Sequence, residues 1–160
     1  MDTVENAICQ WAKEKPKLDT QPMAIIGRMM RVTKHLETQI AQLHKQHGLK
    51  LGEFDVLASL LRSGAPYCLT PSELISALML TSGAMTNRLS RLEAKGLIAR
   101  IHSEQDRRSV SVQLTDQGFA LIDPLISEHV ALQTQLVESI PVDQREQLNQ
   151  LLCEWLGQFE

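Results

Sequence analysis

Thr81-Ser-Gly-Ala-Met-Thr-Asn-Arg-Leu-Ser-Arg-Leu-Glu-Ala-Lys-Gly96 is the stretch of sequence that decides the fold. On a helical wheel of about 100° per residue, Met85, Leu89, Leu92 and Gly96 cluster within about 60°, which predicts a helix with one packed face. The preceding Thr70-Pro71-Ser72-Glu73 has the pattern of another helix start, with Thr as the cap, Pro at the first helical position and Glu three residues after the cap. We therefore expect two short helices in tandem.

Two strands are predicted after this pair of helices. Residues 97–101 and 110–114 are enriched in aliphatic and β-branched side chains, and the polar run 103–109 separates them. Helix, turn, helix and hairpin together form a DNA-reading layout. In this layout the second helix enters a major groove, and the hairpin tip, Asp106-Arg107-Arg108, reaches toward the neighbouring minor groove.

The outward face of the second helix carries small hydrogen-bonding side chains. They suit close approach to base edges, since Asn can bond adenine in two places and Thr can touch a thymine methyl group. Arg91 and Lys95 lie at the margin of this face, where contact with phosphate would add affinity without sequence choice. An ordinary solvated polar face is the alternative. The predicted base-contact set, including the helix start, is Ser82, Gly83, Thr86, Asn87 and Ser90.

The hairpin tip carries candidate contacts of its own. Asp106 lies two residues before Arg108, close enough to hold its guanidinium and aim it into a narrow minor groove, with Arg107 beside it. A plain surface turn with a weak ion pair is the alternative. The charge distribution favours phosphate contact: residues 81–108 hold six Lys or Arg against three Asp or Glu, whereas the whole chain of 160 residues has a net charge of −3.

Further helices are predicted on both sides of this unit, over residues 4–13, 22–47, 52–62, 115–137 and 141–156. The terminal helices are amphipathic, yet the chain has little left for them to cover, so pairing with a second copy would bury their apolar faces. We expect a mainly α fold with a small β-hairpin wing. In this single domain, 1–160, a winged helix-turn-helix region, 52–118, is flanked by dimerisation helices, 1–47 and 119–160.

The composition argues against several classes of protein. No run approaches the roughly 20 apolar residues of a membrane span, and the N-terminus lacks the features of a signal peptide, so a cytoplasmic protein without membrane contact is expected. An enzyme is not expected, because the sequence has no phosphate loop, dinucleotide fingerprint, metal-protease motif or nucleophile elbow, and no cofactor is predicted.

The three cysteines, Cys9, Cys68 and Cys153, are widely spaced and odd in number, which indicates neither a disulfide framework nor a zinc cluster. Buried thiols are the expectation. A redox-sensing Cys9 is the alternative. Such a thiol would call for a tyrosine or a cation nearby, and Tyr67, the one tyrosine, is far away in sequence.

The sequence resembles the MarR family of winged-helix repressors. The resemblance rests on Leu-Ser-Arg-Leu-Glu-Ala-Lys-Gly-Leu-Ile-Ala-Arg (89–100), on Asp-Arg-Arg-Ser-Val (106–110) and on Val-Gln-Leu-Thr-Asp-Gln-Gly (112–118), and the flanking helices extend it over nearly the whole chain. It implies a homodimer made by the N- and C-terminal helices, a palindromic operator of double-stranded DNA, and release by a ligand.

A narrower resemblance is to the urate-responsive branch of that family, the HucR- and PecS-like regulators. It rests on Trp11 in an extra N-terminal helix and on residues 18–19, 22–23, 52–58 and 82–88. It implies an effector that is a small aromatic anion, urate or a related purine. The ligand-sensing residues would be Trp11, Asp55, Arg88 and Arg100.

The helical wheel supports part of this implied ligand site. Arg88 lies about 60° from the centre of the packed face, an unusual place for a cation without an anionic partner. Asp55 could be that partner in the absence of ligand. On its own wheel, however, Asp55 falls near Ser59 and Arg62, so an ordinary solvated carboxylate is equally compatible with the sequence.

Other readings stay open. The regulator could respond to another aromatic acid or phenol, or to thiol oxidation, and His35, His44 and His47 could serve zinc sensing, although no acidic or thiol partner stands at ligand spacing. From a different class, the chain could be a helical protein-interaction module without DNA binding. Salt-dependent binding to a palindromic duplex separates that class from a repressor.

Overall fold

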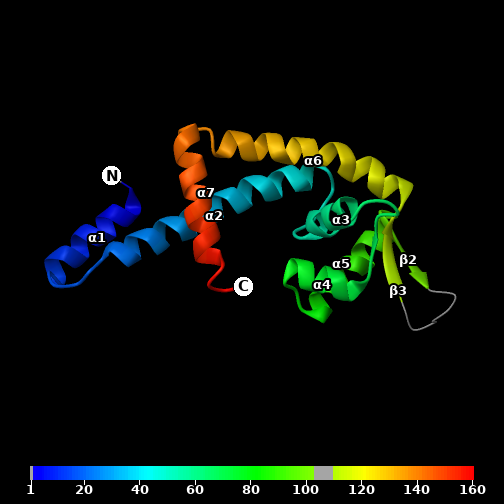
Figure 1. The fold of residues 1–160 in the computed structure, drawn as a ribbon, viewed down its shortest axis with the longest axis horizontal. Helices are drawn as coiled ribbons and strands as arrows, with labels where there is room; N and C mark the ends of the chain where they lie inside the picture. The colour runs from blue at the N-terminus through cyan, green and yellow to red at the C-terminus, as the bar shows by residue number, and fades with distance from the viewer. Residues whose placement is uncertain (1, 103–109) are drawn as a thin grey trace. The chain divides into compact units, whose positions relative to one another are not determined.

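The computed structural model describes residues 2–102 and 110–160, and Figure 1 shows its fold. These residues form seven helices and a three-stranded antiparallel sheet. Every predicted helix is confirmed within two residues at its start, and both predicted strands are present. In chain order the elements are α1 (Thr3–Glu14), α2 (Gln21–Gln46), α3 (Glu53–Arg62), β1 (Cys68–Leu69), α4 (Pro71–Leu78), α5 (Ser82–Ala94), β2 (Ile98–His102), β3 (Val110–Leu114), α6 (Asp116–Leu136) and α7 (Val142–Leu156).

Threonine caps begin three of the helices. The predicted capping box at α4 is present: the Thr70 hydroxyl accepts the Glu73 N–H at 3.2 Å, and the Glu73 carboxylate accepts the Thr70 N–H at 2.7 Å. Thr81 and Thr115 cap α5 and α6 in the same way, each accepting an N–H three residues on. These bonds satisfy helix N–H groups that would otherwise lack partners, which is why the tandem helices start where the sequence predicts.

The sheet has the order β1-β3-β2. β2 and β3 form the predicted hairpin, with Ile98 opposite Leu114 and His102 opposite Val110. β1 was not predicted, because two residues are too short to show an alternating pattern. It pairs with β3 through Cys68 opposite Gln113 and Leu69 opposite Val112.

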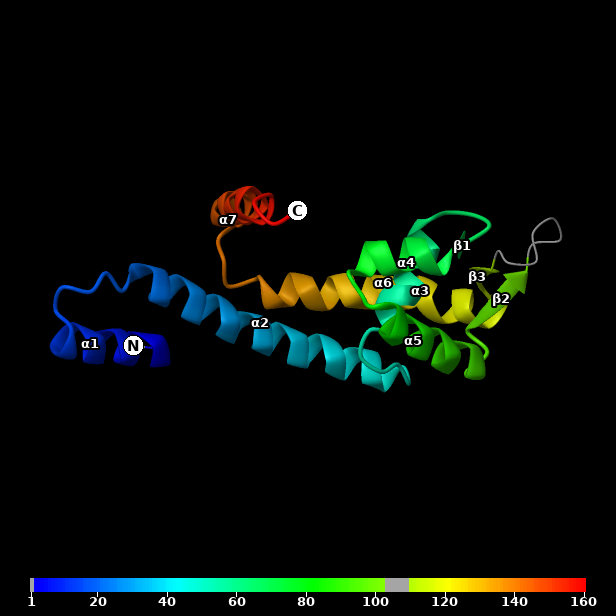
Figure 2. The same ribbon diagram turned by 90° about the horizontal axis from the view of Figure 1, so that it is seen from below.

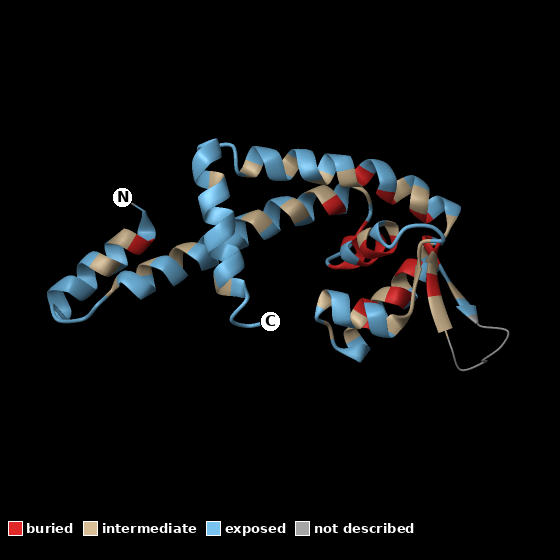
Figure 3. Cartoon of the chain, in the orientation of Figure 1, coloured by how far each residue is buried: buried red, intermediate tan, exposed pale blue. Residues whose placement is uncertain are grey.

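The hydrophobic core lies among α3, α4, α5, the sheet and the first half of α6, where the buried residues gather in Figure 3. The predicted packed face of α5 is confirmed, since Met85, Leu89 and Leu92 are buried. On α3 the buried surface extends over more than one side of the helix. Val56 and Glu53 are fully buried alongside Leu57, because several other elements contact this helix.

The described chain divides into two compact units, Met1–Gln42 and Leu43–Glu160. In the first unit, α1 packs against the N-terminal part of α2, as Figure 2 shows. Val4 is buried against Gly27, where a Cβ would stand 3.4 Å from the valine side chain. Arg28 forms ion pairs with Asp2 at 2.8 Å and with Glu5 at 2.7 Å. The short helix is therefore ordered by docking, as its length requires.

Large apolar side chains remain exposed on both flanks of the chain. On α2 they include Met30, which is 70% exposed, and on α7 they include Leu151, which is 64% exposed. Residues 142–156 of α7 are all described, and none of them is buried. In the described part of the chain, no helix is long and apolar enough to cross a membrane.

The expectation of buried thiols is wrong for two of the three cysteines. Cys9 and Cys153 are exposed, and Cys68 is half-buried. Cys9 lies on α1 and Cys153 on α7, on surfaces that the single chain does not cover, so a cysteine among apolar neighbours in sequence is not thereby placed in the core.

Candidate nucleic-acid interface

The outward face of α5 is polar and exposed, as the helical wheel predicts. Gly83, Thr86, Asn87 and Ser90 are all exposed, as is Ser82 at the helix start. A Cβ at Gly83 would meet nothing within 4 Å, so this surface can approach another molecule closely. The Thr86 hydroxyl donates to the Ser82 carbonyl at 2.8 Å, so its proton is already engaged within the helix. Base contact by these residues stays a prediction.

The hairpin is joined to α5 by Arg100 of β2. Its guanidinium forms an ion pair with Glu93 and donates to the Ser90 hydroxyl at 3.2 Å. Ser90, predicted to contact bases, therefore also positions the wing strand against the helix. The predicted contacts at the hairpin tip, Asp106, Arg107 and Arg108, lie outside the described residues.

Arg91 and Lys95 share one partner, the Glu53 carboxylate of α3. The Lys95 ammonium lies 2.5 Å from Glu53 Oε2 and donates to the Gly48 carbonyl at 2.8 Å. Arg91 Nε lies 3.2 Å from Glu53 Oε1, in an ion pair whose N–H is not aligned for a hydrogen bond. Both cations thus neutralise a carboxylate of α3, a contact that their place at the margin of the polar face did not predict. Any contact with phosphate that they make in addition stays a prediction.

Glu53 is a fully buried carboxylate that stays charged. Burial alone would raise the pKa of Glu53, but hydrogen bonds from the Lys50 backbone N–H and from Lys95, with the charges of Lys95 and Arg91, outweigh it and lower the pKa. A sequence pattern could have revealed the burial. Glu53 precedes Leu57 by four residues and Leu60 by seven, which places it on the apolar face of α3.

Among the described residues, no ion pair or hydrogen bond joins the predicted ligand residues Arg88, Asp55 and Arg100 to one another. Arg88 is half-buried, and its guanidinium lies against Gly52, the residue that caps α3 with a φ of 75°. Among the described residues Arg88 forms no ion pair, so the predicted Arg88–Asp55 pair is absent. Asp55 is exposed, and its charge acts instead on two histidines, His44 and His129. Arg100 is engaged with α5, as described above.

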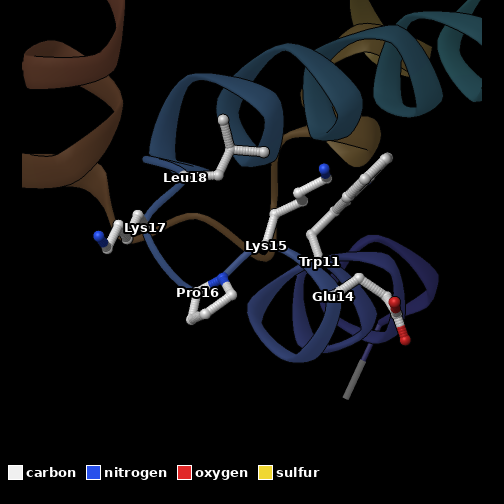
Figure 4. A pocket seen from close by; sticks show the side chains of 6 residues that line it. All are labelled: Trp11, Glu14, Lys15, Pro16, Lys17 and Leu18. Atoms are coloured by element: carbon white, nitrogen blue, oxygen red, sulfur yellow. The ribbon is translucent and has the colours of Figure 1, made fainter.

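Trp11 belongs to the first unit, where it lines a pocket of about 550 Å³ at the turn between α1 and α2. Its side chain is 40% exposed. Figure 4 shows the Trp11 indole and the Lys15 side chain extending in the same direction from the C-terminal end of α1. The lining combines an aromatic ring with charged groups of both signs: Trp11, Glu14, Lys15, Pro16, Lys17 and Leu18.

Two of the three histidines considered for zinc, His44 and His47, have other partners. His44 Nε2 lies 3.2 Å from His129 Nδ1, and Phe54 stacks on both rings with centroid distances of 4.0 and 4.5 Å. His47 pairs with Glu128 at 2.9 Å. Within residues 2–102 and 110–160, no group of three or more His, Cys, Asp or Glu could hold a metal ion. The zinc alternative therefore has no site in the described chain.

Comparison with known proteins shows which family shares this sequence and architecture. A model of the MarR family matches residues 47–109. The transcriptional regulator PecS of Dickeya dadantii is 40% identical over 149 residues, which cover 93% of this chain and 90% of that protein. The regulator PrsX of Escherichia coli is 27% identical over 124 residues, 78% of this chain and 74% of that protein. Both are named as helix-turn-helix regulators rather than enzymes.

Solved structures show the same fold. A cysteine-to-serine mutant of E. coli MarR in complex with operator DNA is 27% identical and aligns with a TM-score of 0.73 over 86% of this chain and 97% of that one. AbsC of Streptomyces coelicolor, at 21% identity, aligns with a TM-score of 0.78 over 89% and 95% of the two chains. The capped tandem helices, the hairpin and these similarities agree, and the chain belongs to the MarR family of DNA-binding, winged helix-turn-helix transcription regulators.

Proposed function

We propose that the protein is a homodimeric repressor that holds a palindromic operator with α5 and the wing, and that a small aromatic anion, urate or a related purine, releases it. The observation that carries the DNA-reading part is the exposed polar face of α5, presented on a helix whose opposite face is buried in the core. Side chains that read base edges need this combination of a fixed helix and a free polar surface.

The exposed apolar surfaces of α2 and α7 support the dimer. Such surfaces are unfavourable in water, and a second copy would cover them symmetrically. Two half-sites of a palindrome then match the two copies. Sedimentation equilibrium should give twice the mass of the 18.0 kDa chain at micromolar concentration. A monomer under these conditions would remove the palindromic operator from the proposal.

Arg88 supports an anionic effector. Its half-buried guanidinium has no carboxylate partner among the described residues, and it lies on the inner flank of the helix proposed to read DNA. An anion bound to it would act directly on α5, because Arg88 follows the proposed reading residue Asn87 by one position. The resemblance to the urate-responsive branch, to which PecS-like sequences belong, supports urate as the first ligand to try.

The decisive experiment titrates urate, xanthine and salicylate separately against the complex with DNA from upstream of the protein's own coding region. We expect urate to release the DNA, Arg88→Ala to keep DNA binding but lose release, and Trp11→Phe to weaken release. Arg31→Ala, which removes an exposed arginine of α2, is the matched control and should respond as wild type. Release by salicylate alone would favour an aromatic acid as effector. Normal release from Arg88→Ala would remove Arg88 from effector sensing, and normal release from Trp11→Phe would remove Trp11.

A further inference from the structure

We propose that Glu53 is a positioning residue for DNA reading: its buried carboxylate fixes the C-terminal end of α5 and engages Lys95 and Arg91 so that they do not serve as phosphate contacts. This inference rests on DNA binding by α5. It concerns neither the effector nor the dimer, so it can fail while those proposals stand.

The geometry joins three elements at one carboxylate. Glu53 is the first residue of α3, and Lys95 is the C-cap of α5. The Lys95 ammonium bonds Glu53 Oε2 at 2.5 Å and the Gly48 carbonyl, in the turn after α2, at 2.8 Å. The Lys50 N–H of the same turn donates to Glu53 Oε2 at 2.7 Å. The end of α5 is therefore held to α3 and to the turn that precedes it.

Burial makes this contact hard to exchange for phosphate. The Glu53 side chain is fully buried, whereas the Arg91 and Lys95 side chains are 38% and 32% exposed. A buried carboxylate that loses its cations is strongly unfavourable, and this cost opposes the release of counterions that a contact with phosphate would gain. We expect the two cations to stay with Glu53 for this reason.

The position of the contact matters for reading bases. Asn87 lies eight residues before Lys95, about 12 Å along the helix axis at the usual rise. A tilt of about 10° at the held end would move Asn87 by about 2 Å, more than the range of donor–acceptor distances that a hydrogen bond tolerates. Loss of the Glu53 contact should therefore weaken binding to the preferred DNA sequence more than it weakens binding to DNA of any sequence.

Lys95→Gln separates positioning from phosphate contact. The probes are a duplex that the wild-type protein selects from a random library and a scrambled duplex of equal length. We expect about tenfold weaker binding to the selected duplex, unchanged binding to the scrambled one, and an unchanged slope of log affinity against log salt. Lys95→Arg keeps the charge and the donors and should restore the preference. Lys45→Gln, which removes an exposed lysine of α2 outside this contact, is the matched control.

Equal losses on both duplexes, with a slope reduced by about 1, would make Lys95 a phosphate contact and overturn the proposal. Glu53→Gln provides the reciprocal test. It frees both cations, so binding to scrambled DNA should strengthen and the salt slope should steepen while the preference falls. An unchanged preference in a folded Glu53→Gln protein would also overturn it. If Glu53→Gln does not fold, Lys95→Gln still decides, because the Lys95 side chain is partly exposed.

Discussion

The guanidinium of Arg88 lies directly on the backbone of Gly52, so closely that a Cβ at position 52 would overlap its Cζ atom. Gly52 has a φ of 75°, in the left-handed region that favours glycine, and it caps α3. One glycine thus gives α3 its start and gives the proposed ligand-sensing arginine of α5 its place. The residue types at 52 and 88 depend on each other through space, although they are 36 positions apart.

Gly52→Ala should therefore cost more than backbone strain alone. Gly48 is the matched control, since its φ of 72° is nearly the same and nothing stands within 4 Å of its Cβ position. Gly48→Ala should destabilise the fold by about 1–2 kcal/mol from the left-handed backbone. Gly52→Ala should destabilise the fold by more than Gly48→Ala does, because the new Cβ displaces Arg88. It should also weaken the response to the effector for the same reason. Urea unfolding measures the first effect. Equal losses in the two variants would show that Arg88 moves aside freely.

Gly118 is a second position where only glycine fits. A Cβ there would overlap the carbonyl oxygen of Leu97, and a backbone atom cannot move aside as a side-chain end can. Gly118→Ala should destabilise the protein by about 3 kcal/mol or more, because the start of α6 must shift from the hairpin. Gly157→Ala, where the new Cβ would make an ordinary contact at 3.5 Å, should change stability by less than about 1 kcal/mol. A Gly118→Ala protein as stable as wild type would contradict the close packing.

The stacked histidines predict a loss of stability in acid. Burial, first of all, lowers the pKa of both His44 and His129 below the usual value of 6.5, with the nearby Asp55 charge acting in the opposite direction. Below about pH 6.5 the unfolded chain takes up these protons more readily than the folded protein, so the free energy of unfolding should fall as pH falls through this range.

Urea unfolding between pH 7.5 and 5 measures this dependence. His129→Gln should flatten the curve, since it removes one member of the pair and the charge that would oppose a proton on the other. His35→Gln, which removes an exposed histidine of α2, is the control and should leave the curve as in wild type. A His129→Gln curve as steep as that of wild type would show that other groups set the pH dependence.

We expect α5 to set the preference for one DNA sequence and the wing to contribute affinity for DNA of any sequence. Asn87→Ala removes an exposed amide from α5 and should reduce discrimination at one base position by about 1–3 kcal/mol. Arg108→Ala, in the polar run between β2 and β3, should weaken binding to all sequences and reduce the salt slope by about 1. Competition binding with single-base variants of the selected duplex measures both. Unchanged base preference in Asn87→Ala would mean that another face of α5 meets the DNA.

The sequence by itself determined the helices, the hairpin and the face of α5 that packs, because each rests on interactions within one element. The Thr70 and Thr81 caps bond groups three residues away, and the spacing of Met85, Leu89 and Leu92 reports burial on one helix. Repeated over the chain, these local preferences were sufficient to indicate a winged helix-turn-helix regulator.

Only the tertiary structure decided what each charged side chain binds. Lys95 and Glu53 stand 42 positions apart, Arg88 lies against Gly52, and the charge of Asp55 acts on His44 and His129. A helical wheel gives the direction of a side chain but not the element that meets it. Arg91 and Lys95 at the margin of a polar face therefore looked free for phosphate, although the packing of α3 against α5 had brought a buried carboxylate to both.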